Sequence, residues 1–204
     1  MIKISGLGLK FKDKTIFENF SLRIAEGETV VLRAPSGKGK TSLAYMIMGF
    51  LRPDSGKIEI GGEELNGATV HAIRRRICYI GQDASMPGGT AREIIDEVAS
   101  FSINKHIDFS KERIKDLLEA FSLTEAVLDK QADTISGGER RRLAFVLCVL
   151  LGRDIWLLDE ITAGLDDERK RQVIDHVVGC GKTVVVISHD DVWNEYENVR
   201  HISW

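Results

Sequence analysis

A glycine-rich segment at residues 34–41 carries the side chains best suited to hold phosphate. It reads Ala-Pro-Ser-Gly-Lys-Gly-Lys-Thr, follows a β-branched run and precedes a stretch with apolar residues at helical spacing. Gly37 and Gly39 let the backbone turn so that successive N–H groups point at phosphate oxygens, and the start of the helix adds its positive dipole end. Lys40 can reach the β and γ phosphates, and the Thr41 hydroxyl can ligate Mg²⁺. The nucleotide contacts predicted in this segment are Ser36, Gly37, Lys38, Gly39, Lys40, Thr41 and Ser42.

Two adjacent carboxylates, Asp159 and Glu160, follow an apolar run at 155–158. An apolar strand that ends in an acid places it at the carboxyl edge of a parallel sheet, where ligands of α/β folds bind. Asp159 therefore fits a Mg²⁺ ligand. Glu160 lies on the other side of the strand end and is free to polarise a water molecule.

A second site for an anion is predicted at the start of another helix. Ser136 is a good N-cap, and Gly137 and Gly138 after it leave backbone N–H groups exposed at the helix N-terminus. Within a single chain this helix start has no obvious phosphate to bind.

The elements that position these groups alternate between strand and helix patterns, which predicts an α/β fold. We expect a P-loop NTPase core with a mostly parallel sheet and antiparallel N-terminal strands. Strand patterns occur at 2–11, 20–24, 29–32, 58–60, 77–80, 155–158 and 183–187. Helical patterns occur at 41–50, 91–101, 111–121, 138–151 and 167–178. The run of helical patterns predicts a helical lobe at about 87–151, inserted into a single domain over 1–204 whose core is about 1–86 and 152–204.

Composition excludes several classes of protein. Of 204 residues, 43% are hydrophobic, which is enough for a sizeable core, and 28 Lys and Arg against 31 Asp and Glu leave a net charge of −3. That balance predicts no nucleic-acid partner, and the arginine triplets at 74–76 and 140–142 are interpreted as solvated faces. No uncharged apolar stretch of about 18 residues and no secretory signal is found, so we expect a soluble, cytoplasmic chain. The three cysteines are interpreted as small buried hydrophobic residues.

In their order along the chain, these motifs resemble those of ABC-type ATPases. The segment Ser136-Gly137-Gly138, 24 residues ahead of Glu160, is similar to the signature motif of that family. The resemblance implies four further site residues. They are Phe11 stacking on adenine, Gln82 in the loop between core and helical lobe, Asp166 in a loop that crosses a dimer interface, and the switch residue His189. Departures from the family pattern are Ala34 for Gly, Ile135 for Leu, Glu139 for Gln and Gly164 for Ala.

The resemblance also implies a mechanism of ATP hydrolysis. Two subunits, a homodimer or a pair with a close homologue, would enclose ATP head-to-tail, so that the signature motif of each acts on the phosphates held by the other. Catalysis would depend on Lys40, on Glu160 as general base and on His189 in line with the attacking water. The implied Mg²⁺ ligands are Thr41, Gln82 and Asp159.

Three classes of function fit such an ATPase. The first is the ATP-binding subunit of a membrane transporter, attached to the cytoplasmic face of the membrane through integral-membrane permease subunits. The second is a soluble ATPase of DNA repair or translation, and the third is a regulatory module. Only 96 residues separate Lys40 from Ser136, too few for the long coiled coils of the repair members, which favours the transporter. The stretch at 158–166 further resembles small bacterial ATPases of iron or metal export.

Overall fold

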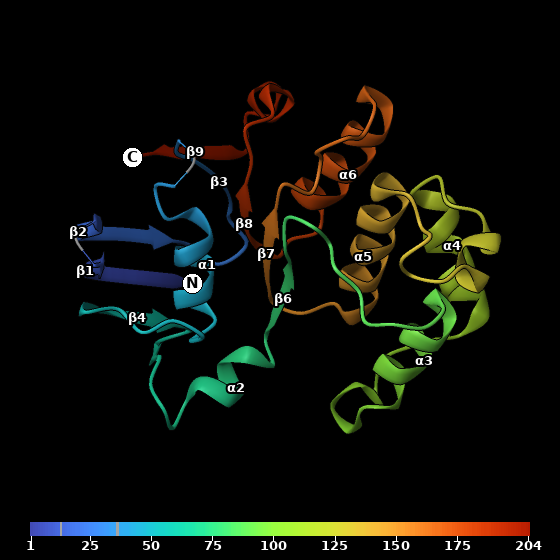
Figure 1. Ribbon diagram of the computed structural model, residues 1–204, viewed down its shortest axis with the longest axis horizontal. Coiled ribbons are helices and arrows are strands. Elements are labelled where there is room, and N and C mark those ends of the chain that lie inside the picture. Colours follow the sequence, from blue (N-terminus) through green and yellow to red (C-terminus); the bar gives the residue numbers. More distant parts are fainter. Residues whose placement is uncertain (13, 36) are drawn as a thin grey trace.

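Two sheets and a group of helices make up the structure, a computed structural model that describes residues 1–12, 14–35 and 37–204 (Figure 1). Within these residues the antiparallel sheet has the order β2-β1-β4-β5 and the parallel sheet the order β6-β7-β8-β3-β9. The antiparallel strands are β1 (Ile2–Phe11), β2 (Lys14–Ile24), β4 (Ser55–Ile60) and β5 (Glu63–Glu64). The parallel strands are β3 (Thr29–Arg33), β6 (Ile77–Ile80), β7 (Ile155–Asp159), β8 (Thr183–Ile187) and β9 (Val199–Ser203). The predicted fold class is confirmed.

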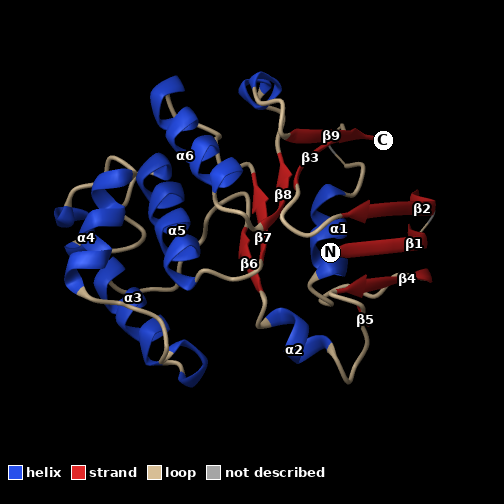
Figure 2. Cartoon of the chain, turned by 180° about the vertical axis from the view of Figure 1, so that it is seen from behind, coloured by secondary structure: helices blue, strands red, loops and turns tan. Residues whose placement is uncertain are grey.

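The helices lie on both sides of the parallel sheet. The α-helices are α1 (Lys40–Ile47), α2 (Val70–Arg74), α3 (Ala91–Ser100), α4 (Lys111–Ala120), α5 (Gly137–Leu151) and α6 (Asp167–Gly179). Short 3-10 helices are η1 (Ser102–Asn104), η2 (Glu125–Asp129) and η3 (Asp191–Glu195). Seen from behind in Figure 2, α3, α4 and α5 gather at one end, the antiparallel sheet lies at the other, and the parallel sheet stands between them.

The middle of the parallel sheet is fully buried. Every residue of β7 and of β8 is buried, as expected for parallel strands that are covered on both faces and rich in Val, Ile and Leu. Strand β8 pairs with β7 on one side and with β3 on the other. Because these strands run in the same direction, the loops after β3, β7 and β8 leave from one edge of the sheet.

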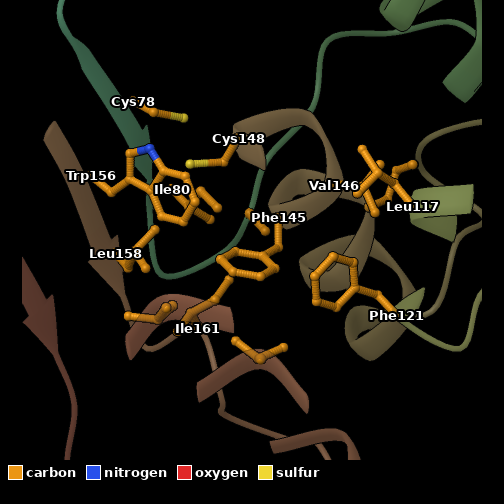
Figure 3. Close-up of a cluster of buried hydrophobic side chains, with 14 of the residues drawn as sticks. Cys78, Ile80, Leu117, Phe121, Phe145, Val146, Cys148, Trp156, Leu158 and Ile161 are labelled. Atoms are coloured by element: carbon orange, nitrogen blue, oxygen red, sulfur yellow. The ribbon is translucent and has the colours of Figure 1, made fainter. Parts of the chain in front are cut away.

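A hydrophobic core joins the helical end of the molecule to the sheet (Figure 3). At its centre Phe145 of α5 meets Phe121 edge-on at 5.0 Å and Trp156 of β7 edge-on at 5.8 Å. His176 of α6 stacks on Trp156 with 3° between the ring planes. Figure 3 also shows Cys78 and Cys148 in this core, as predicted for buried cysteines, whereas Cys180 is only half-buried. Helices α4, α5 and α6 therefore share one core with the sheet.

A second core lies on the other face of the parallel sheet. It packs the apolar side of α1, including Leu43 and Met46, against β1 and against residues of β3, β7 and β8. Helix α1 is thus held between the two sheets, and its first two residues, Lys40 and Thr41, are the last two of the glycine-rich segment.

Most predicted elements are confirmed, but α2, β5, β9, the 3-10 helices and the first half of β2 (14–19) were not predicted. The interpretation of residues 140–142 as a solvated face was wrong, because Arg142 is 9% exposed and its two neighbours are half-buried. These arginines pack close to helix α6 and the loop before it, which periodicity along α5 alone does not reveal. Among the described residues, no helix is both long and apolar enough to span a membrane.

Candidate nucleotide site

A cavity of about 600 Å³ opens at the edge of the parallel sheet where β3, β7 and β8 end. It brings together ten of the predicted site residues: Phe11, Gly37, Gly39, Lys40, Thr41, Ser42, Gln82, Asp159, Glu160 and His189. Lys14 and Ile16 of β2 complete its lining and were not predicted. A larger hollow of about 810 Å³ beside the end of α1 contains none of the predicted residues.

The glycine-rich loop has the backbone that its sequence predicts. Gly37 and Gly39 adopt left-handed φ angles of 75° and 89°. A Cβ on Gly39 would lie 2.3 Å from Cγ2 of Ile16, so glycine is required there by both conformation and space. The φ angle of Ala34 lies outside the left-handed region, which explains why alanine is tolerated there. The predicted contact Ser36 lies outside the described residues.

The ammonium of Lys40 is held at the centre of the cavity. Its Nζ donates to the carbonyl of Ala34 and lies 2.9 Å from Nε2 of His189, which follows β8. Two predicted catalytic residues 149 positions apart are therefore in direct contact. An anion that enters the cavity can therefore interact with the Lys40 ammonium and with the His189 ring at the same time.

Asp159 and Thr41 offer a pair of hard oxygen ligands. The Thr41 hydroxyl donates to Oδ2 of Asp159 at 3.4 Å, and Asp159 is only 4% exposed. Burial raises the pKa of Asp159, and the nearby charge of Glu160 raises it further. Because burial and the charge of Glu160 disfavour the ionised form of Asp159, a bound cation would stabilise it. Mg²⁺ prefers oxygen ligands. These residues fit Mg²⁺, although no cluster of three or more His, Cys, Asp or Glu side chains occurs in the described chain.

Replacing Asp159 with Asn should raise the melting temperature of the nucleotide-free protein at pH 7. The raised pKa means that the folded state disfavours the charged carboxylate, and the amide removes that charge without changing shape. The gain should shrink as pH falls through the raised pKa of folded Asp159, and it should vanish below the ordinary aspartate pKa of about 3.9, where the side chain is protonated in both states. Thermal unfolding of both proteins over this pH range tests the expectation, and an Asn variant that is less stable at pH 7 would contradict it.

Glu160 is held in an unusual backbone conformation. Its φ is 53°, a left-handed value that is uncommon for a residue with a side chain. Its N–H donates to the carbonyl of Ile187 at 2.8 Å, and its own carbonyl accepts from the N–H of Ala163 at 3.0 Å. Such strained residues concentrate at functional sites, and here the carboxylate reaches the cavity beside Asp159.

Gln82 connects the cavity to helix α5. Its backbone carbonyl accepts a hydrogen bond from Nη2 of Arg141 at 3.2 Å. The other guanidinium nitrogen of Arg141 lies near Gly164, in the loop before α6. Sequence reasoning missed this link because it joins three segments that are distant along the chain.

The signature-like segment lies outside the cavity. Ser136 caps α5 by accepting from the N–H of Glu139 at 3.3 Å, and the Glu139 carboxylate accepts from the Ser136 N–H at 3.2 Å. Neither Ser136 nor the glycines after it line the cavity. Asp166 is also absent from the lining; it caps α6 by accepting from the N–H of Arg169 at 3.0 Å. The structure therefore does not bring these four predicted nucleotide contacts to the cavity of their own chain.

The cap of α5 should make stability depend on acid pH. Hydrogen bonds from Lys130 and Ser136 lower the pKa of Glu139 from 4.5 to about 2. The stabilisation is complete above pH 4.5, where an unfolded Glu is also charged, and is lost as pH falls toward 2. We expect Glu139→Gln to lower the melting temperature at pH 7 and the difference to shrink below pH 4. An unchanged difference between pH 7 and pH 3 would contradict this account.

A glycine-rich loop between β3 and α1, with two acids at the end of β7, defines a P-loop nucleoside triphosphatase of the cassette type. Residues 17–163 match the family described as ABC transporter. The chain belongs to the ABC transporter family and is an ATPase of that family.

Similar proteins agree with this assignment. The chain is 30% identical over 203 residues to the cytochrome c biogenesis ATP-binding export protein CcmA of Maricaulis maris, covering 97% of this chain and 90% of that protein. It is 30% identical over 200 residues to ABC transporter BEA3 of Gibberella fujikuroi, covering 92% of this chain but 15% of that protein. Its fold matches the dimeric structure of MJ0796, a bacterial ABC transporter cassette, with a TM-score of 0.81 and 25% identity, over 100% of this chain and 94% of that one.

Proposed function

We propose that this chain is the ATP-hydrolysing subunit that powers a membrane transporter, and that ATP drives it into a head-to-tail dimer. The observation that carries the proposal is that the groups for hydrolysis gather in one cavity while Ser136, Gly137 and Gly138 lie outside it. Each copy then holds one half of a site, and a second copy supplies the other half. Closure on ATP and reopening after hydrolysis would provide the mechanical step.

Within one half-site, each residue has a chemical role that fits its position. Lys40 and the loop N–H groups bind the phosphates, and Glu160 takes the proton of the attacking water. His189, whose Nε2 already lies 2.9 Å from the Lys40 ammonium, holds the γ-phosphate in line. Mg²⁺, bound through Thr41, Asp159 and Gln82, would neutralise negative charge on the β and γ phosphate oxygens.

The glycines after Ser136 support a role across a dimer interface. Neither Gly137 nor Gly138 has a left-handed φ, and a Cβ on either would have its nearest neighbour at 3.8 Å and 3.5 Å. Their own chain therefore does not require glycine at the start of α5, where glycine weakens a helix. The missing side chains leave N–H groups open to close approach by a phosphate.

An exposed aromatic surface at Tyr45 of α1 and at Phe50, just after this helix, supports docking on a permease. Tyr45 and Phe50 are 42% and 64% exposed. The Tyr45 ring contacts the ring of Tyr79 edge-on, with 6.2 Å between the centroids, and Tyr79 lies three residues before Gln82 in the sequence. Arg74 lies over the Phe50 ring at 4.1 Å. Exposed apolar patches mark interaction sites, and this patch contacts Tyr79 of β6, the strand that leads to Gln82. A permease seated here would place the chain at the cytoplasmic face of the membrane.

The proposal is tested by capture of the Glu160→Gln protein, with ATP, from detergent-solubilised membranes of its own cell. We expect an integral-membrane protein at near-equal stoichiometry, and loss of that protein when Phe50→Ala is added. The substitution Lys105→Ala, at another exposed position, serves as the matched control. Recovery of the dimer alone, or of ribosomal or DNA-repair proteins, would favour a soluble ATPase and overturn the transporter role. The resemblance to iron or metal exporters stays a prediction until such a permease is known.

A further inference from the structure

Lys14, the first residue of β2, lies against the glycine-rich loop. In the β1–β2 pair it is the partner of Phe11, and both residues line the cavity. A Cβ built on Gly37 would lie 3.3 Å from Nζ of Lys14, so the ammonium is in contact range of the loop backbone. One hairpin thus carries an aromatic ring and a cation to the same cavity.

The charge of Lys14 has no counterpart on the described part of the chain. No acidic side chain among those residues lies within ion-pair distance of it. Lys40, the other lysine that lines the cavity, is already held by Ala34 and His189. An ammonium placed over a loop that presents N–H groups adds positive charge where phosphate oxygens would bind.

We propose that Lys14 is a nucleotide-binding residue whose ammonium donates to a phosphate oxygen of ATP, next to the adenine contact of Phe11. The inference rests on the nucleotide site of the proposed function and adds a residue to it. It assigns to the β1–β2 hairpin a role in recognising the charged end of the nucleotide as well as the base. Lys14 then contributes to affinity and discriminates nucleotides from the uncharged nucleoside.

Binding of ATP and of adenosine to Lys14 variants tests this role. We expect Lys14→Met, which keeps the apolar stem, to weaken ATP binding about tenfold, as for loss of one charged hydrogen bond. Adenosine binding should not change, and Lys14→Arg should restore most of the ATP affinity. The loss should also shrink at high salt, because screening weakens the ammonium–phosphate attraction.

Lys12→Met is the matched control. Lys12 lies in the turn of the same hairpin, is exposed and does not line the cavity, so the same change of charge should leave ATP affinity within twofold of the parent. The role of Lys14 is overturned if Lys14→Met binds ATP as tightly as the parent protein, or if adenosine affinity falls as much as ATP affinity. Failure of the parent protein to bind ATP would instead count against the nucleotide site as a whole.

Discussion

Replacing Glu160 with Gln is expected to lower ATP turnover by about 10²- to 10⁴-fold, the range for loss of a general base. The amide has nearly the same shape but cannot take a proton from water. ATP binding should persist, because Lys40 and the loop N–H groups are untouched. Since opening of the dimer would follow hydrolysis, the variant should also accumulate as a dimer when ATP is added, which size-exclusion chromatography with light scattering measures.

Glu168→Gln provides the matched control for this experiment. Glu168 is exposed in the first turn of α6 and does not line the cavity, so the same chemical change there should leave turnover within twofold of the parent. Parent-like turnover in Glu160→Gln would remove Glu160 from the role of base. Loss of turnover together with loss of ATP binding would show that the Glu160 carboxylate contributes to nucleotide binding instead.

Mixing two inactive variants is expected to restore ATPase activity if each site is shared between two copies. Lys40→Ala removes the phosphate ligand of the cavity, and Gly137→Asp places a negative charge where the γ-phosphate of the partner would approach. The aspartate fits the chain itself, because Gly137 is exposed at the start of α5 and an acid there interacts favourably with the helix dipole. Gly137→Asp should therefore keep or raise the melting temperature while losing turnover.

In a mixed dimer one site combines an intact Lys40 with an intact Gly137, and the other site has neither. Random pairing of equal amounts makes about half of the dimers mixed, so about a quarter of parent activity should return if the two sites act independently. Each variant alone is the control. Two different affinity tags show whether mixed dimers form. If they form but stay inactive, a single site shared between two copies cannot hydrolyse ATP by itself.

The parts of the site that follow one another closely along the chain could be predicted. The glycine-rich loop and the pair Asp159 and Glu160 are recognisable because each is bounded by a strand or a helix with a clear period. Lys14 and Arg141 could not be found this way, because their roles come from contacts across a hairpin and between loops far apart in sequence. The positions of these two charged side chains relative to the cavity are known only from the folded structure.

The fold was predictable to a similar degree and for a similar reason. Strands β7 and β8 are continuous apolar runs, so burial on both faces leaves a plain signal. Strand β9 lies at the edge of the sheet with only Val199 buried, and its short pattern, Val-Arg-His-Ile-Ser, is too weak to distinguish from a loop. The proposed limits of the helical lobe, at about 87 and 151, stay a prediction.

The strand order has a consequence for how this protein folds during its synthesis on the ribosome. Within the described residues, strand β3, which leads into the glycine-rich loop, pairs only with β8 and β9, and Thr183 lies 150 positions after Arg33. At bacterial or eukaryotic rates of synthesis, roughly 10–30 s pass before those partners exist. During that interval the apolar residues of β3 lack their native neighbours, and a nascent chain is exposed to misfolding and to chaperones. The ATP site therefore forms late, after nearly all of the described chain has been translated.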